Sequence, residues 1–169
     1  MTKRIATTGR IVRRTTDLDA PAEVIWAAAQ TPQAFRYVTR GLLDWRPLRG
    51  QTDPWRQGDE ATGWLLLFGV VPFSKHRIRV AEIDPATRTL RSEESGGAIR
   101  SWCHDIVVEE IDADRCRYTD EIRLDAGPLT LAVTAFAWVF YGERQRRWRR
   151  LAPALAGAER VRADTASAT

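Results

Sequence analysis

The chain has 169 residues, of which 44% are hydrophobic and 28% charged, with a formal net charge of +4. This length supports one domain with a sizeable core and is too short for two ordinary domains. Residues 143–150 hold five arginines and one glutamate, so this segment alone accounts for an excess of +4. The remaining charges balance, which leaves no distributed basic face, and we therefore predict that the chain binds no nucleic acid.

The first predicted elements are a strand and two short helices. Residues 10–19, RIVRRTTDLD, are rich in β-branched residues and predict a strand. The next segment, DAPAEVIWAAAQ, predicts a helix with Asp19 as N-cap and Pro21 in the first turn. In TPQAFRYV, Thr31 is the predicted N-cap of a second helix, and Pro32 is its first helical residue.

The central part of the chain, from Leu43 to Leu124, predicts a series of about six strands. The segments with strand character are LLDWRPL, EATGWLLLF, KHRIRVAEI, TLRSEE, IRSWCHDIVVEEI and CRYTDEIRL. Turns rich in Gly, Pro and Asp separate them, so consecutive strands must be antiparallel neighbours. With the first strand paired at one edge, we expect a curved sheet of about seven strands.

A long helix is predicted after Asp125, over LTLAVTAFAWVFYGERQRRWRRLA, and its end is densely basic. Three interpretations compete: a membrane-surface helix, a basic arm for nucleic acid, and a helix whose apolar half closes a core while its arginines stay in solvent. A membrane-surface helix separates an apolar face from a basic face along its whole length, whereas here the polarity changes along the axis. We therefore favour the third interpretation, because arginines in the last turns also complement the helix dipole.

Together these elements predict an α+β fold in which a curved antiparallel sheet wraps around the long C-terminal helix. Such a sheet buries one face only if another element covers it, and the final helix is the only one long enough. The predicted organisation is an N-terminal extension over residues 1–9, one ligand-binding domain over residues 10–152 and a flexible C-terminal tail over residues 153–169.

The N-terminal residues and the cysteines bear on location and on cofactors. MTKRIATTGR has no apolar run of a secretory signal, and no stretch of about 18 apolar residues follows. We predict a cytoplasmic protein without membrane insertion, either a monomer or a homodimer. Cys103 and Cys116 match no zinc-site spacing, and His76 and His104 lack nearby paired carboxylates. We therefore expect reduced thiols, no metal and no cofactor, with His76 at the surface.

Strand alternation predicts two polar residues in the interior. Asp120 shares a face with Tyr118, Ile122 and Leu124, and His104 shares a face with Trp102, Ile106 and Val108. The two residues either satisfy each other within the core or contact a ligand, and catalysis is a further alternative. If the connecting turn is DADR, His104 falls opposite Arg123, so a one-residue bulge is needed to bring His104 and Asp120 onto one face.

Aromatic residues predict the walls of a core or cavity. Trp64 alternates with Leu66 and Phe68, and Trp45 is likewise expected inside. Large aromatic walls suit a planar ligand, although plain packing explains any one tryptophan equally well. On the long helix, the expected wall residues are Phe136, Phe140 and Tyr141, with Trp148 near the end.

Two runs of the sequence resemble a known superfamily. TTDLDAPAEVIWAAAQTPQAF looks like the opening of the START-like helix-grip superfamily, also called SRPBCC, which includes polyketide cyclases, lipid-transfer domains and plant pollen-allergen proteins. IRSWCHDIVVEEI followed by CRYTDEIRL is similar to paired strands of its bacterial branch, where a W-x-H strand precedes one with an acidic residue. The resemblance covers roughly residues 10–152 and implies a cavity for an apolar or amphipathic small molecule between sheet and helix.

We therefore expect the chain to bind an apolar or aromatic small molecule that is lipid-, polyketide- or steroid-like. The alternative is an enzyme of the polyketide cyclase or aromatase type, with His104 as base, Asp120 as its orienting partner and Tyr141 as proton donor. The residues alone do not decide between enzyme, carrier and sensor. The predicted ligand-binding residues are Trp45, Trp64, Leu66, Phe68, Trp102, His104, Tyr118, Asp120, Phe136 and Phe140.

Overall fold

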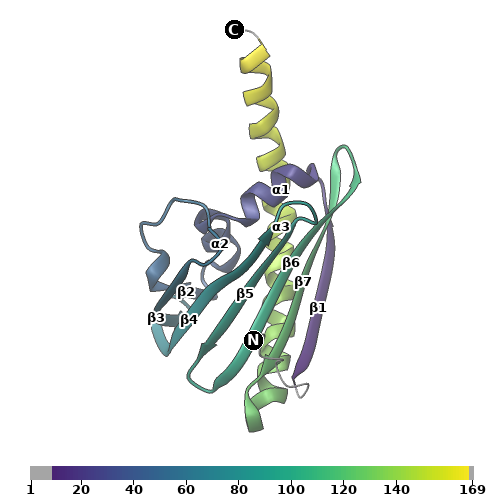
Figure 1. The fold of residues 1–169 in the computed structure, drawn as a ribbon. Helices are drawn as coiled ribbons and strands as arrows, with labels where there is room; N and C mark the ends of the chain where they lie inside the picture. The colour runs from purple at the N-terminus through teal and green to yellow at the C-terminus, as the bar shows by residue number, and fades with distance from the viewer. Residues whose placement is uncertain (1–8, 168–169) are drawn as a thin grey trace.

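A computed structural model of the chain describes residues 9–167 (Figure 1). Its strands are β1 (Arg10–Leu18), β2 (Leu43–Trp45), β3 (Glu60–Leu67), β4 (Val71–Asp84), β5 (Thr89–Gly96), β6 (Ile99–Asp112) and β7 (Arg115–Asp125). Its helices are α1 (Ala22–Ala29), α2 (Pro32–Thr39) and α3 (Thr130–Ser167), with short 3₁₀ turns η1 (Arg46–Leu48) and η2 (Gly127–Leu129). Residues 1–8 of the predicted N-terminal extension lie outside the described residues.

The seven strands form one antiparallel sheet in the order β1-β7-β6-β5-β4-β3-β2. Strands β2 to β7 follow one another as a meander, and β1 joins the edge of β7, as the turn pattern predicted. The sheet curls around α3, which lies on its concave side, while α1 and α2 stand near one end (Figure 1). The predicted α+β helix-grip fold is confirmed.

The two short helices begin differently. Thr31 caps α2, because its side chain accepts a hydrogen bond of 3.2 Å from the backbone N–H of Ala34, and Pro32 is the first helical residue, as predicted. The start of α1 differs from the prediction, since Pro21 and not Asp19 occupies the cap position, and no side chain within residues 9–167 caps this helix. Its buried residues nevertheless have the expected helical spacing.

One stripe of α3 is buried against the sheet and the small helices. Its members recur every three or four residues: Ala137, Phe140, Tyr141, Arg144, Gln145, Trp148, Ala152 and Ala156. The expectation that the arginines stay in solvent is therefore wrong for Arg144, which is only 4% exposed. Arg144 is buried because it follows Tyr141 by three residues and precedes Trp148 by four, so it shares their face.

Helix α3 is longer than the sequence predicted. It has 38 residues, and residues 153–167, interpreted above as a tail, continue it beyond the sheet (Figure 1). Pro153 lies inside the helix, and Ala156, three residues later, is still buried in the core. The alanines that follow have high intrinsic helix propensity, which a search for apolar periodicity overlooks. A domain boundary at residue 152 stays a prediction.

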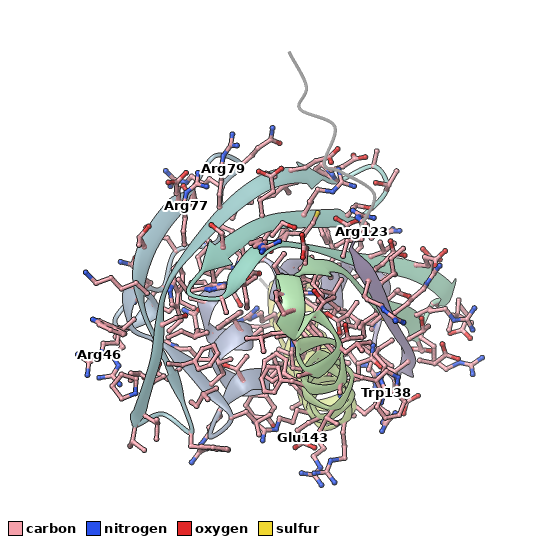
Figure 2. The ribbon with its side chains drawn as sticks, turned by 90° about the horizontal axis from the view of Figure 1, so that it is seen from below. Arg46, Arg77, Arg79, Arg123, Trp138 and Glu143 are labelled. Carbon is pink, nitrogen blue, oxygen red and sulfur yellow. The ribbon has the colours of Figure 1, made fainter. Side chains whose placement is uncertain are left out.

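Arginine side chains lie on the convex side of the sheet, and one of β1 contacts the outer face of α3 (Figure 2). Figure 2 shows Arg77, Arg79 and Arg123 on the convex side of the sheet, pointing away from α3. Trp138 lies on the side of α3 near β1, where the Arg14 guanidinium is 4.0 Å from its ring centroid (Figure 2). A Cβ atom on Gly142 would collide with that guanidinium. Because Gly142 has no side chain, the Arg14 side chain of β1 has room to contact the outer face of α3.

Candidate ligand-binding pocket

A pocket of about 320 Å³ lies between the concave side of the sheet and the first half of α3. This volume is at the lower end of the roughly 300–1,000 Å³ typical of small-molecule sites. Most of the lining is apolar, namely Phe35, Leu43, Leu65, Leu67, Phe73, Ile78, Ile99, Trp102, Leu129, Ala132, Val133, Phe136, Phe140 and Tyr141. The remaining lining residues are a histidine, a carboxylate and a guanidinium: His76, Glu94 and Arg144.

Four of the predicted site residues meet in this pocket. Phe136, Phe140 and Tyr141 come from α3, and Trp102 comes from β6. The ring centroids of Phe136 and Phe140 are 5.6 Å apart, those of Phe140 and Tyr141 5.2 Å, and those of Tyr141 and Trp102 6.2 Å. They form a continuous aromatic wall, because these separations lie in the range of direct ring contact.

The other predicted aromatic residues lie elsewhere. Trp64 is 41% exposed and Phe68 66% exposed, so neither points inward as expected. Strand β3 is displaced by one residue from the predicted phase, because Leu65 and Leu67 face the pocket instead. Leu66 is buried without lining it. Trp45 is also buried, and its indole N–H donates a 3.3 Å hydrogen bond to the carbonyl of residue 76.

His104 and Asp120 are hydrogen-bonded to each other across β6 and β7, with 2.8 Å between His104 Nε2 and Asp120 Oδ1. The register of these strands shifts between Glu110 and Asp112, so the one-residue bulge that this pairing requires is present at residue 111, and His104 lies opposite Ile122 and not opposite Arg123. Neither side chain lines the 320 Å³ pocket; His104 borders a neighbouring cavity of about 60 Å³.

Asp120 is the centre of a buried polar network that joins the sheet to α3. Its side chain is fully buried and accepts hydrogen bonds from the hydroxyl of Tyr118 at 3.2 Å and from the amide of Gln145 at 3.5 Å. Burial and the adjacent carboxylate raise the pKa of Tyr118 well above its ordinary value, so its hydroxyl remains a donor. The fourth partner is Arg144, whose Nη2 lies 3.7 Å from Asp120 Oδ1.

His76 is buried, which corrects its predicted surface location. Strand β4 begins at Val71 and not at residue 75, so His76 lies within the strand and its side chain faces the pocket. His76 Nε2 is 3.2 Å from Glu94 Oε2, and the Ser92 hydroxyl donates to Glu94 Oε1 at 2.9 Å. Burial alone would raise the pKa of Glu94, but the hydrogen bond and charge of His76 outweigh it and lower that pKa. Glu94 is therefore an ionised, well-bonded carboxylate.

Arg144 is the functional candidate that the sequence analysis missed. It lines the pocket, and its guanidinium carbon is 4.9 Å from the centroid of the Tyr141 ring. Burial alone would lower the pKa of Arg144, but Asp120 and the other nearby acidic groups raise it, so the side chain stays cationic. Burial raises the pKa of Tyr141, which keeps its phenol neutral. The spacing from Tyr141 to Trp148 was the signal that could have placed Arg144 inside.

Within the described residues 9–167, membrane-spanning helices, clusters of metal-ligating side chains and disulfides are all absent. Within this range, none of the helices has the length and apolar character needed to cross a membrane. No group of three or more His, Cys, Asp or Glu side chains in the described part of the chain is arranged to hold a metal ion. Cys103 and Cys116 are both buried, and neither forms a disulfide within the described residues.

The fold is that of the START-like helix-grip proteins, and solved structures with this fold superpose on most of the chain. Norcoclaurine synthase from Thalictrum flavum, in complex with dopamine and hydroxybenzaldehyde, is 12% identical with a TM-score of 0.63, covering 89% of this chain and 96% of the other. A START superfamily protein from Mycobacterium smegmatis is 12% identical with a TM-score of 0.61, covering 86% and 98%. The Zhui aromatase/cyclase from Streptomyces sp. R1128 is 16% identical with a TM-score of 0.59, covering 90% and 94%.

At these identities the likeness shows a shared fold and nothing about a shared reaction. A search of the curated proteins found no match. Residues 16–154 match the family described as Domain of unknown function (DUF8410), and the chain belongs to that family.

Proposed function

We propose that this protein binds an apolar or aromatic small molecule, lipid-, polyketide- or steroid-like, in the pocket between the sheet and α3. The observation that carries the proposal is the 320 Å³ pocket itself, whose walls are mostly apolar and aromatic. An unfilled apolar space of this size sacrifices packing contacts, so an occupant of matching character stabilises it. Trp102, Phe136, Phe140 and Tyr141 are the proposed contact residues.

The neighbouring structures support the same class of ligand. The norcoclaurine synthase structure is that of a complex with dopamine and hydroxybenzaldehyde, which are two small aromatic molecules. The Streptomyces protein is an aromatase/cyclase. The aromatic wall of the present pocket suits planar rings of this kind through stacked and edge-on contacts.

The test uses N-phenylnaphthylamine, a neutral fluorescent probe for apolar sites. We expect its emission to rise on binding, with energy transfer from tryptophan. Val133→Phe, which adds a ring to the pocket lining, should abolish the increase, whereas Val139→Phe, on the same helix but 67% exposed and outside the lining, should retain it. Absence of a probe signal in the unaltered protein, or equal signals in both variants, would contradict the proposal.

The cyclase-type alternative rests on the contact of His104 with the helix. The His104 and Tyr141 rings are 4.9 Å apart edge to face, and Tyr141 lines the pocket. In this alternative Asp120 orients His104, and Tyr141 supplies a proton to a ligand whose carbonyl lies in the pocket. The fully buried position of Asp120 favours a structural role for the pair equally well.

Proton abstraction next to a carbonyl can be measured without knowing the natural substrate. With acetylnaphthalene as ligand in deuterated water, NMR follows the exchange of the methyl protons. The enzyme alternative requires the protein to accelerate this exchange and His104→Ala to remove the acceleration while probe binding persists. If the unaltered protein does not accelerate the exchange, the enzyme alternative and the role of His104 as a base are wrong, and ligand binding stands as the proposed function.

A further inference from the structure

The inner end of the pocket has hydrogen-bond donors without acceptors. Among the described residues, Arg144 makes no hydrogen bond, and its Nε is a buried donor without a partner. The indole Nε1 of Trp102, which also lines the pocket, is a second buried donor; it interacts with the Tyr141 hydroxyl but forms no hydrogen bond of normal geometry among the described residues. Both side chains flank the Tyr141 ring, at 4.9 Å and 6.2 Å from its centroid. A buried donor that lacks an acceptor costs free energy, so this cluster is incomplete without one.

The protein's own carboxylates do not complete it. Asp120 Oδ1 is 3.7 Å from Arg144 Nη2, beyond hydrogen-bonding distance, and it already accepts from His104 and Tyr118. Glu94, the other carboxylate near the pocket, is engaged by His76 and Ser92. The cation of Arg144 thus has one distant ion pair and an unused planar set of N–H donors that matches a carboxylate in shape.

We propose that the ligand is an amphipathic carboxylic acid whose carboxylate is bound by Arg144 at the inner end of the pocket, with Trp102 and the Tyr141 hydroxyl as further donors. This inference rests on the proposed function and assigns the chemical class of its ligand. The apolar body of the acid lies along Phe136 and Phe140. An acceptor without charge would satisfy the donors but would leave the guanidinium less well paired.

The test compares three ligands of one shape: naphthoic acid, naphthamide and naphthylmethylamine. Each is added to the unaltered protein, and its dissociation constant is measured by displacement of N-phenylnaphthylamine and by calorimetry. We expect the acid to bind at least about tenfold more tightly than the amide, because a hydrogen bond to a charged group contributes that much. The amine should bind most weakly, since it brings a second cation to Arg144.

Variants assign the preference to one side chain. Arg144→Met should reduce the acid-to-amide ratio to about one while N-phenylnaphthylamine still binds. Arg150→Met is the matched control, because Arg150 is exposed on the same helix and lies outside the pocket lining. Glu94→Gln should strengthen acid binding and leave amide binding unchanged, because it removes a like charge from the lining.

The outcomes separate this inference from the proposed function. If the neutral probe binds but the acid binds no more tightly than the amide, the proposal of a carboxylate ligand is wrong, whereas the proposed apolar pocket stands. The same holds if the amine binds most tightly. Failure of every ligand and of the probe overturns both. If Arg144→Met does not fold, the ligand series on the unaltered protein still decides, and Arg144→Lys tests whether the planar donor set is needed. Persistence of the acid preference in Arg144→Met would reject Arg144 as its source.

Discussion

The two halves of the α3 interface are built from similar residues but differ in how their buried charged groups are satisfied. In the packed half, from Gln145 to Ala156, Trp148 is 1% exposed and its ring packs beside that of Tyr118, whose hydroxyl is bonded to Asp120. The indole Nε1 of Trp148 has no hydrogen-bond partner among the described residues, so unsatisfied donors are not confined to the pocket. In the pocket half, up to Arg144, aromatic side chains line an open volume, and Arg144 makes no hydrogen bond to any described residue. A buried charge whose hydrogen bonds are saturated indicates a structural role, whereas one without hydrogen bonds beside a pocket indicates a place for a ligand.

The largest test of this contrast is removal of the saturated carboxylate. Asp120→Ala leaves three donors and the Arg144 cation without their partner, so we expect a loss of about 3–5 kcal/mol in the free energy of unfolding. Denaturant unfolding measures it. Asp17→Ala is the control, because Asp17 forms an exposed ion pair with Arg117 and should cost less than about 1 kcal/mol. Similar losses in the two variants would contradict a central role for Asp120.

A pair of tyrosines sharpens the comparison at the level of one hydroxyl. Tyr118→Phe removes a buried hydrogen bond to a charged group and should cost about 1.5–3 kcal/mol of unfolding free energy. Tyr141→Phe should cost less than about 1 kcal/mol of unfolding free energy, because Tyr141 lines the pocket, where water can take over the interactions of its hydroxyl. Tyr141→Phe should instead weaken binding of naphthoic acid. A larger stability loss for Tyr141 than for Tyr118 would reverse the assignment of the two halves.

The smallest expected effect is a pH dependence at the pocket wall. The pKa of Glu94 is lowered in the folded protein from an ordinary value of 4.5, so its contribution to stability is complete above that value. The contribution is lost as the pH falls through the lower, folded-state pKa. We therefore expect Glu94→Gln to make the decrease of unfolding free energy below pH 4.5 shallower, as measured by denaturant unfolding at several pH values. Parallel pH profiles for the two proteins would contradict this account.

Much of the fold could be predicted from the sequence because it rests on local signals. Turn residues between alternating segments are enough to give the strand order, and Thr31 followed by Pro32 is enough to place the start of α2. The contact of His104 with Asp120 could be considered from the sequence for the same reason, because strand alternation and a single bulge determine whether the two side chains share a face. Each of these features depends on neighbours in sequence or in a tight hairpin.

The pocket was harder to predict because its lining depends on where each element begins. An early start of β4 moves His76 from the strand end to the interior, and a one-residue difference in β3 exchanges Trp64 for Leu65. Arg144 was assigned to solvent from the composition of its neighbours, although the stripe through Tyr141 and Trp148 includes it. Helical position, and not residue type, decides which side chain is buried there.

The contact of Arg14 with the outer face of α3 has a consequence for the inner face, which lines the pocket. Successive residues of an α-helix are rotated by about 100° around its axis, so a small turn of α3 would carry Arg144 away from the pocket. Arg14 lies over Trp138 and beside Gly142, so it contacts the outer face of α3 from a position outside the binding site. Contacts between β1 and α3 are therefore part of what sets the rotation of the helix, and with it the position of the Arg144 guanidinium.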